Sequence, residues 1–117
     1  MPEAASPSVV LLITSDGMGH ATAELQHKLM GTYLRLLIEH DHRPAAICFY
    51  TDGVKLVVEG SPVLDQLKAL EAQGVHLIVC STCLTYVGLT DKVRVGIVGG
   101  MPDILEAQWR ASKVITL

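Results

Sequence analysis

The sequence has few aromatic residues and few cysteines, and both shortages narrow what the chain can be. Aromatic side chains make up only 4% of the 117 residues although half of the residues are hydrophobic, so the core must consist of Val, Leu, Ile and Ala. Three cysteines are too few, and odd in number, for a small secreted domain that depends on disulfides. Such an aliphatic core is typical of a parallel sheet that helices cover on both faces.

Basic clusters, long apolar runs and a signal-peptide pattern are also absent from the sequence. The formal charge is −3, and the scattered Lys and Arg residues argue against nucleic acid or an anionic membrane surface as a partner. The longest apolar stretch, at 75–80 and interrupted by His76, is far too short to span a bilayer. The first seven residues lack the basic start and cleavage pattern of a signal peptide. We therefore expect a soluble, cytoplasmic protein.

The order of apolar runs and turn residues predicts strands and helices that alternate along a single domain at 1–117. β-branched apolar runs indicate buried strands, and apolar residues three and four apart indicate helices. The expected strands are 8–14, 45–50, 75–80, 94–98 and 113–117; the expected helices are 21–40, 61–73, a short segment before Gly88 and one that begins at Met101. Five such alternations predict an α/β fold, a three-layer α/β/α sandwich with a five-stranded parallel sheet of the Rossmann or flavodoxin-like kind.

Some details of the helices are also predicted. The first helix has an apolar stripe at helical spacing, which is expected to face the core: Leu25, Leu29, Tyr33, Leu36 and Leu37. In the second helix, Ser61 is expected to be the N-cap and Pro62 the first helical residue, where its missing N–H is not needed. The last helix is expected to turn Ile104, Leu105 and Ala107 inward. The apolar stretch 54–58 fits neither type of element clearly.

Cys80 and Cys83 form a Cys-x-x-Cys pair where the third strand meets a helix. Sites in open parallel sheets form outside the carboxyl ends of the strands, which directs attention to this loop. Backbone N–H groups at a helix start stabilise a thiolate and lower its pKa, and a thiolate accepts or donates a sulfane sulfur. The second cysteine is then within reach to resolve a persulfide or close a disulfide. The alternative is that both cysteines are small packing residues.

Lys55 is the third candidate for the site. It follows Gly53 in the loop after the second strand, at the same edge as Cys80, where its charge would lower the pKa of a neighbouring thiol. The alternative is a solvated surface lysine. Cys48 lies inside an apolar run and is expected to be a small buried hydrophobe. We expect no metal, because a structural zinc needs four ligands, and no cofactor, because the 15–20 loop lacks the dinucleotide fingerprint and the Walker lysine.

A series of motifs carries a resemblance to a known family. They are GVKLVVEGSPVL at 53–64, Leu67-Lys68, Cys80-x-Thr82-Cys83-Leu84, the opening Thr14-Ser15-Asp16-x-Met18-Gly19 and the closing Ser112-Lys113-Val114-Ile115. Together they span nearly the whole chain, which resembles the DsrE/DsrF-like sulfur-relay family and, within it, the C-terminal domain of YedF-type selenium-metabolism proteins. The resemblance implies a parallel five-stranded sheet, a homo-oligomer and sulfur transfer through a cysteine at the end of the third strand. That sulfur-carrying cysteine falls on Cys80, and Cys83 matches the second cysteine of the YedF-type pattern.

The chain departs from this pattern in two places. YedF-type proteins usually begin with a small domain that resembles the TusA sulfur carrier, and this sequence has none, so the donor would be a separate protein, such as a TusA-like carrier. The first loop also differs, with Gly17 and with His-Ala-Thr at 20–22 where an Arg-Gly-type continuation is common.

The leading hypothesis is therefore a sulfurtransferase-like persulfide carrier that works with donor and acceptor proteins. Selenium handling rests on the resemblance only, and turnover as an enzyme is left open. One alternative is a non-catalytic module that binds a small ligand or assembles through the same cleft. Another is a thiol–disulfide oxidoreductase, although the pair does not open a long helix after an early strand, as in thioredoxin.

Overall fold

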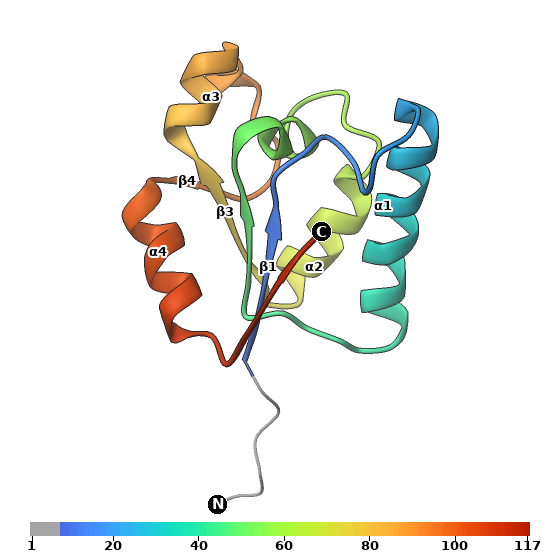
Figure 1. The fold of residues 1–117 in the computed structure, drawn as a ribbon, viewed down its shortest axis with the longest axis vertical. Helices are drawn as coiled ribbons and strands as arrows, with labels where there is room; N and C mark the ends of the chain where they lie inside the picture. The colour runs from blue at the N-terminus through green and yellow to red at the C-terminus, as the bar shows by residue number, and fades with distance from the viewer. Residues whose placement is uncertain (1–7) are drawn as a thin grey trace, which may run out of the picture.

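A five-stranded, all-parallel sheet organises the fold (Figure 1). The computed structural model of the chain describes residues 8–117. Its strands are β1 (Val9–Ile13), β2 (Ala46–Phe49), β3 (His76–Cys80), β4 (Ile97–Gly99) and β5 (Lys113–Thr116), in the order β4-β3-β2-β1-β5. Its α-helices are α1 (Ala23–Glu39), α2 (Leu64–Ala72), α3 (Ser81–Val87) and α4 (Met101–Arg110), with 3-10 turns η1 (Thr51–Val57) and η2 (Thr90–Lys92). The predicted fold class is confirmed.

Helices lie on both faces of the sheet, which explains why the central strands are apolar throughout. In Figure 1, α1 and α2 lie to one side of the sheet and α4 to the other, and α4 leads from the edge strand β4 to the opposite edge strand β5. All four residues of β2 are buried, and Leu11 and Leu12 of β1 pair with Ile47 and Cys48 beside them. A strand covered on both faces reads as a continuous apolar run, whereas β4 and β5 at the edges are largely exposed.

The inner face of α1 differs from the predicted one. Met30 and Leu34 are fully buried, and Tyr33 and Leu37 pack against the core beside them. These four residues follow the i, i+3, i+4, i+7 spacing of a single helical stripe. The remaining apolar residues of the predicted stripe lie outside it and are exposed: Leu25, Leu29 and Leu36. The prediction was wrong for these three because α1 carries more apolar positions than one stripe can bury.

Two local expectations need correction, and one stretch that the sequence left open is assigned. The second helix begins at Leu64 with Val63 at its N-cap, and the Ser61 hydroxyl accepts the Val63 N–H at 3.2 Å in a turn that precedes the helix. The ambiguous stretch at 54–58 belongs mostly to η1, and Val58 forms an isolated bridge with Val93. On α4, Ile104 is buried as expected, but Leu105 is 52% exposed, because one side of this helix has no neighbour in the described part of the chain.

No helix within residues 8–117 has the length and apolar character needed to cross a membrane.

Candidate functional site

The Cys-x-x-Cys pair lies at the carboxyl edge of the sheet, as predicted. β3 ends at Cys80, which is the N-cap of α3, and Cys83 lies in the first turn of that helix. In Figure 1, β3 leads directly into α3 at the top of the molecule. The turn η1, which follows β2, packs against both β3 and α3, so residues of the second loop also reach this edge.

The two cysteines differ in their access to solvent. Cys80 is 2% exposed and belongs to the core, where it pairs in register with Gly99 of β4. Cys83 is partly exposed and lines a pocket of about 320 Å3. The other residues around this pocket come from η1 and α3: Thr51, Asp52, Thr82, Tyr86 and Val87. Of the pair, Cys83 is therefore the residue that an incoming molecule can reach, and Cys80 is buried in the core.

Thr51 contacts the Cys83 sulfur through its backbone. The Thr51 N–H donates a hydrogen bond to Cys83 Sγ at 3.1 Å. Thr51 has φ +49°, which is rare for a β-branched residue, and its hydroxyl lies within hydrogen-bond reach of the carbonyls of Thr14 and Tyr50. Sequence reasoning missed Thr51, because a backbone N–H is common to all residues except proline and leaves no signature in the sequence.

The pKa of Cys83 is shifted in the direction opposite to the one expected. Burial raises the pKa of the Cys83 thiol, and a side-chain hydrogen bond with Cys80 raises it further, whereas the Thr51 N–H acts to lower it. The lowering expected at a helix start is therefore outweighed by burial and by the neighbouring Cys80.

Lys55 and Cys48 complete the set of predicted residues. Lys55 lies in η1, and its ammonium pairs with Asp52 Oδ1 at 3.2 Å, so part of its charge is balanced beside the Cys83 pocket. Cys48 is fully buried in β2, and burial raises the pKa of its thiol from 9.0 to about 11. Cys48 is thus a packing residue, as expected. Within residues 8–117, no three His, Cys, Asp or Glu side chains gather closely enough to hold a metal ion.

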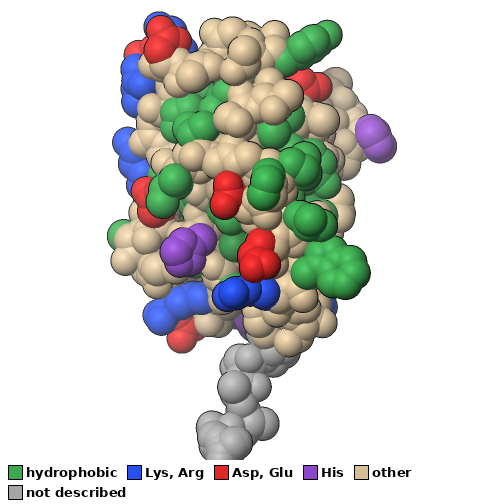
Figure 2. All heavy atoms as spheres, turned by 90° about the vertical axis from the view of Figure 1, so that its left-hand side faces the viewer, with side chains coloured by type: hydrophobic (Ala, Val, Ile, Leu, Met, Phe, Trp, Pro, Cys, Tyr) green, Lys and Arg blue, Asp and Glu red, His purple; other side chains and the backbone are tan. Residues whose placement is uncertain are grey.

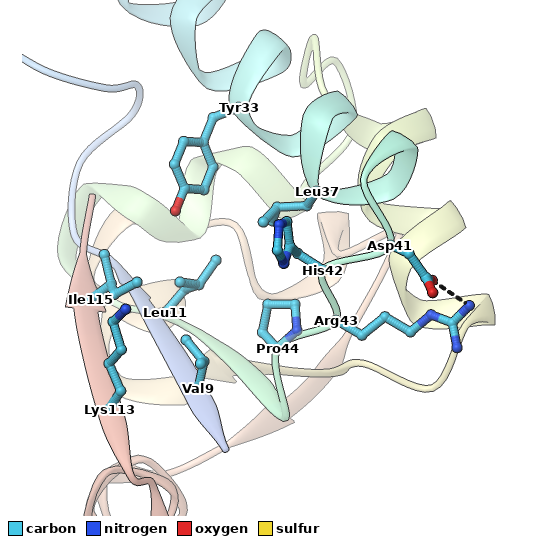
Figure 3. Close-up of a pocket in the computed structure, with 10 residues that line it drawn as sticks. All are labelled: Val9, Leu11, Tyr33, Leu37, Asp41, His42, Arg43, Pro44, Lys113 and Ile115. Carbon is cyan, nitrogen blue, oxygen red and sulfur yellow. Dashed lines mark ion pairs between the residues drawn. The ribbon is translucent and has the colours of Figure 1, made fainter. Parts of the chain in front are cut away.

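A second hollow, of about 480 Å3, lies between α1 and the edge strand β5, near the amino ends of the strands (Figure 3). Val9, Leu11 and Ile115 form an apolar floor, the Tyr33 hydroxyl points toward the sheet, and the Lys113 ammonium lies beside Ile115. Sequence reasoning did not find this pocket, because it considered only the carboxyl edge of the sheet.

Comparison with known proteins agrees with the fold. Residues 8–117 match the profile of the DsrE/DsrF-like family, and the chain belongs to that family. The crystal structure of the YchN protein from E. coli is similar, with a TM-score of 0.71 and 19% identity over 96% of this chain and 100% of that one. A protein of unknown function, MTH1491 from Methanobacterium thermoautotrophicum, has a TM-score of 0.70 and 22% identity over the same shares. Identities this low show a common fold only, and among curated proteins none matches this chain significantly.

Proposed function

We propose that the chain is a persulfide carrier whose sulfur-exchanging centre is the Cys80–Cys83 pair. Membership of the DsrE/DsrF-like family favours a role in sulfur relay. The observation that carries the proposal is the placement of two neighbouring free thiols at the carboxyl edge of a parallel sheet, one lining a pocket and one buried in the core. Parallel sheets commonly place their reactive groups at this edge.

The two cysteines take different roles in this proposal. The resemblance assigns the carried sulfur to Cys80, but access favours Cys83 as the first acceptor, since Cys80 is 2% exposed. The Cys83 thiolate attacks the terminal sulfur of a donor persulfide, R–S–SH. A bond forms from Cys83 to that sulfur while the donor's S–S bond breaks, and the donor leaves as a thiolate that takes up the proton released by Cys83. A thiolate of the acceptor protein removes the terminal sulfur in the same manner.

Cys80 provides a second route when no acceptor is bound. Its thiolate attacks the inner sulfur of the Cys83 persulfide, which forms a Cys80–Cys83 disulfide and releases the terminal sulfur as hydrosulfide. The two cysteine sulfurs are oxidised and the sulfane sulfur is reduced, so the electrons balance. A thiol reductant then reopens the disulfide. Because the pKa of Cys83 is raised, only a small part of it is thiolate at neutral pH, and loading should accelerate as the pH rises.

Intact-protein mass spectrometry after incubation with a polysulfide tests this proposal. Cys80→Ser should gain and keep the mass of one sulfur atom, the wild type should gain it transiently before the Cys80–Cys83 disulfide forms, and Cys83→Ser should not gain it. Cys48→Ser is the matched control, since it alters the buried third cysteine and should load like the wild type. An adduct lost only in Cys80→Ser would assign the first sulfur to Cys80 instead. No adduct in any form would refute the carrier function.

The donor and the acceptor are separate proteins in this proposal, and a TusA-like carrier is the first donor to test. Selenium in place of sulfur enters only through the resemblance to YedF-type proteins. Selenium uptake is tested by the same mass measurement with a selenosulfide donor. The expected result is an adduct with the mass of selenium on the same cysteine. We also place the chain in the cytoplasm, where reducing conditions keep both thiols free.

We further propose that the chain forms a homo-oligomer through one face of β4 and α4. The space-filling view in Figure 2 looks onto this side of the molecule, where apolar side chains gather. Five large apolar residues of β4 and α4, here called the α4 apolar face, are exposed: Ile97, Val98, Met101, Leu105 and Trp109. Exposed apolar patches of this kind are typical of interfaces.

Trp109 is the only tryptophan and is 82% exposed, so its fluorescence reports directly on this face. The wild type should sediment as an oligomer, and its emission should shift to the blue as the concentration increases. Leu105→Glu should be monomeric, whereas Leu25→Glu, a similarly exposed position on α1, should assemble normally. A wild type that stays monomeric with concentration-independent emission would contradict the proposal.

A second candidate function, binding of a small amphipathic anion, is favoured by the pocket between α1 and β5. The sequence leaves small-ligand binding open as an alternative for the cysteine cleft at the carboxyl edge. The pocket between α1 and β5 is instead near the amino ends of the strands. Arg43 points away from it and pairs with Asp41 at 2.7 Å, so Lys113 provides the positive charge beside an apolar floor (Figure 3). Octanoate should therefore shift backbone amide resonances of β1 and β5. Lys113→Met should abolish those shifts, whereas the control Lys68→Met, on α2, should leave them unchanged. Unchanged shifts in Lys113→Met would refute anion binding in this pocket.

A further inference from the structure

A threonine side chain has no sulfur chemistry of its own, but three structural observations connect Thr51 with the cysteine site. It is a β-branched residue at positive φ, its N–H reaches a cysteine 32 positions later in the chain, and its hydroxyl is directed back at its own loop and at the end of β1. An unfavourable backbone conformation persists only where the surrounding structure holds it in place, and such residues cluster at functional sites.

We propose that Thr51 is part of the sulfur site: its backbone N–H binds the Cys83 sulfur as thiolate and as persulfide, and its hydroxyl fixes that N–H in position. This inference rests on the proposed persulfide chemistry of the pair. It adds a sulfur-binding group that the Cys-x-x-Cys motif does not contain.

The contacts around Thr51 explain how the N–H is held. Tyr50 donates its N–H to the Ile13 carbonyl at 3.2 Å, which ties the end of β2 to β1. The Thr51 hydroxyl then donates to the carbonyl of Thr14, the residue that follows Ile13 at the end of β1. Gly53 packs directly on Ile13, so close that no Cβ would fit, and its N–H returns to the Tyr50 carbonyl at 3.0 Å. The left-handed conformation of Thr51 thus lets the chain turn from β2 into η1 while its N–H faces α3.

The Thr51 N–H counteracts the effects that disfavour the thiolate form of Cys83. Burial and the neighbouring Cys80 both raise the pKa of Cys83, and the Thr51 N–H is the contact that opposes them. A hydrogen bond to an ionised acceptor is about twice as strong as a bond to a neutral one, so this donor favours the thiolate over the thiol. The same donor can follow the negative charge of a persulfide anion when the sulfur chain lengthens by one atom.

Alkylation kinetics of Cys83 test the inference without any sulfur transfer. The rate is measured by peptide mass spectrometry against pH in the wild type, Thr51→Val and Thr51→Ser. Thr51→Val loses the hydroxyl and favours negative φ, so the rate at pH 7 should fall about tenfold and the midpoint of its pH profile should rise. Thr51→Ser keeps the hydroxyl and should restore the wild-type profile. Thr85→Val makes the same change on the exposed side of α3 and should have no effect.

The outcomes separate this inference from the proposed function. If Thr51→Val does not fold, Thr51→Gly replaces it, because glycine accepts positive φ but lacks the hydroxyl, and its rate should also fall. Wild-type pH profiles in both variants would overturn the role of Thr51 while leaving the persulfide proposal intact. A shifted profile in a protein that takes up no sulfur would instead refute the persulfide function and keep the contact between Thr51 and Cys83.

Discussion

Replacement of Gly53 by alanine should destabilise the chain strongly, although it adds only one methyl group. A Cβ at this position would lie 2.0 Å from the carbonyl oxygen of Ile13 and 2.7 Å from its carbonyl carbon. Ordinary contact begins at 3.4 Å, so η1 and the end of β1 would have to separate by about 1.4 Å. Both atoms belong to the backbone of a buried strand, which cannot move aside as a flexible side chain can.

The magnitude follows from what this separation disrupts. Overpacking of a close-packed region costs about 1–3 kcal/mol. The Tyr50 N–H to Ile13 bond and the Thr51 hydroxyl to Thr14 bond lie at the same junction, and each contributes about 1 kcal/mol. We therefore expect Gly53→Ala to lower the free energy of unfolding by about 3–5 kcal/mol, a large part of the total for a domain of this size.

Urea unfolding with two matched glycine variants checks this value. Gly60 has φ +89° and open space around it, so Gly60→Ala should cost only the backbone strain, about 1–2 kcal/mol. Gly31 lies inside α1 with its nearest neighbour at 3.6 Å, so Gly31→Ala should stabilise the helix by about 1 kcal/mol. A Gly53→Ala variant that loses less than Gly60→Ala would refute the close approach of η1 to β1.

Three further predictions concern stability. Because burial raises the pKa of Cys48 from 9.0 to about 11, the folded chain binds its proton more tightly; the free energy of unfolding should fall by about 2–3 kcal/mol from pH 9 to 11, and less in Cys48→Ala. Asp103 Oδ2 accepts the Gly100 N–H at 2.8 Å at the start of α4, so Asp103→Ala should cost about 1 kcal/mol in thermal unfolding, and an unchanged melting temperature would argue against this cap. Leu34→Ala should cost about 2–5 kcal/mol in urea, far more than Leu25→Ala on the exposed side of α1, and equal costs would contradict the inward stripe.

Much of the fold could be predicted because parallel central strands carry a simple signal. β1, β2 and β3 are covered on both faces, so each appears as an apolar run between turn residues. The inner face of α1 could not be predicted, because this helix has apolar residues on more than one side and only the tertiary packing selects Met30 and Leu34. The edge strand β4 is three residues long and exposed, which explains why its expected start at Arg94 was too early.

The candidate site was only partly predictable. The Cys-x-x-Cys spacing and the rule for parallel sheets locate Cys80 and Cys83 correctly at the carboxyl edge. The direction of the Cys83 pKa shift could not be predicted, because desolvation depends on how deeply the side chain is packed. The contact of Thr51 with Cys83 could not be predicted either, because it is made by a backbone N–H in the loop that follows another strand. The role of Lys55 stays a prediction, with its ammonium paired to Asp52.

In the proposed cycle, an incoming sulfur first binds the accessible Cys83, and the buried Cys80 reacts afterwards. The most direct measurement loads the wild type with a polysulfide, blocks the thiols in acid at successive times, and maps the added sulfur by tandem mass spectrometry of the peptides. A persulfide should appear on Cys83 at the earliest times, followed by a Cys80–Cys83 disulfide and released hydrosulfide when no acceptor is present. Added sulfur that appears first on Cys80 or on Cys48, or on no cysteine, would contradict it.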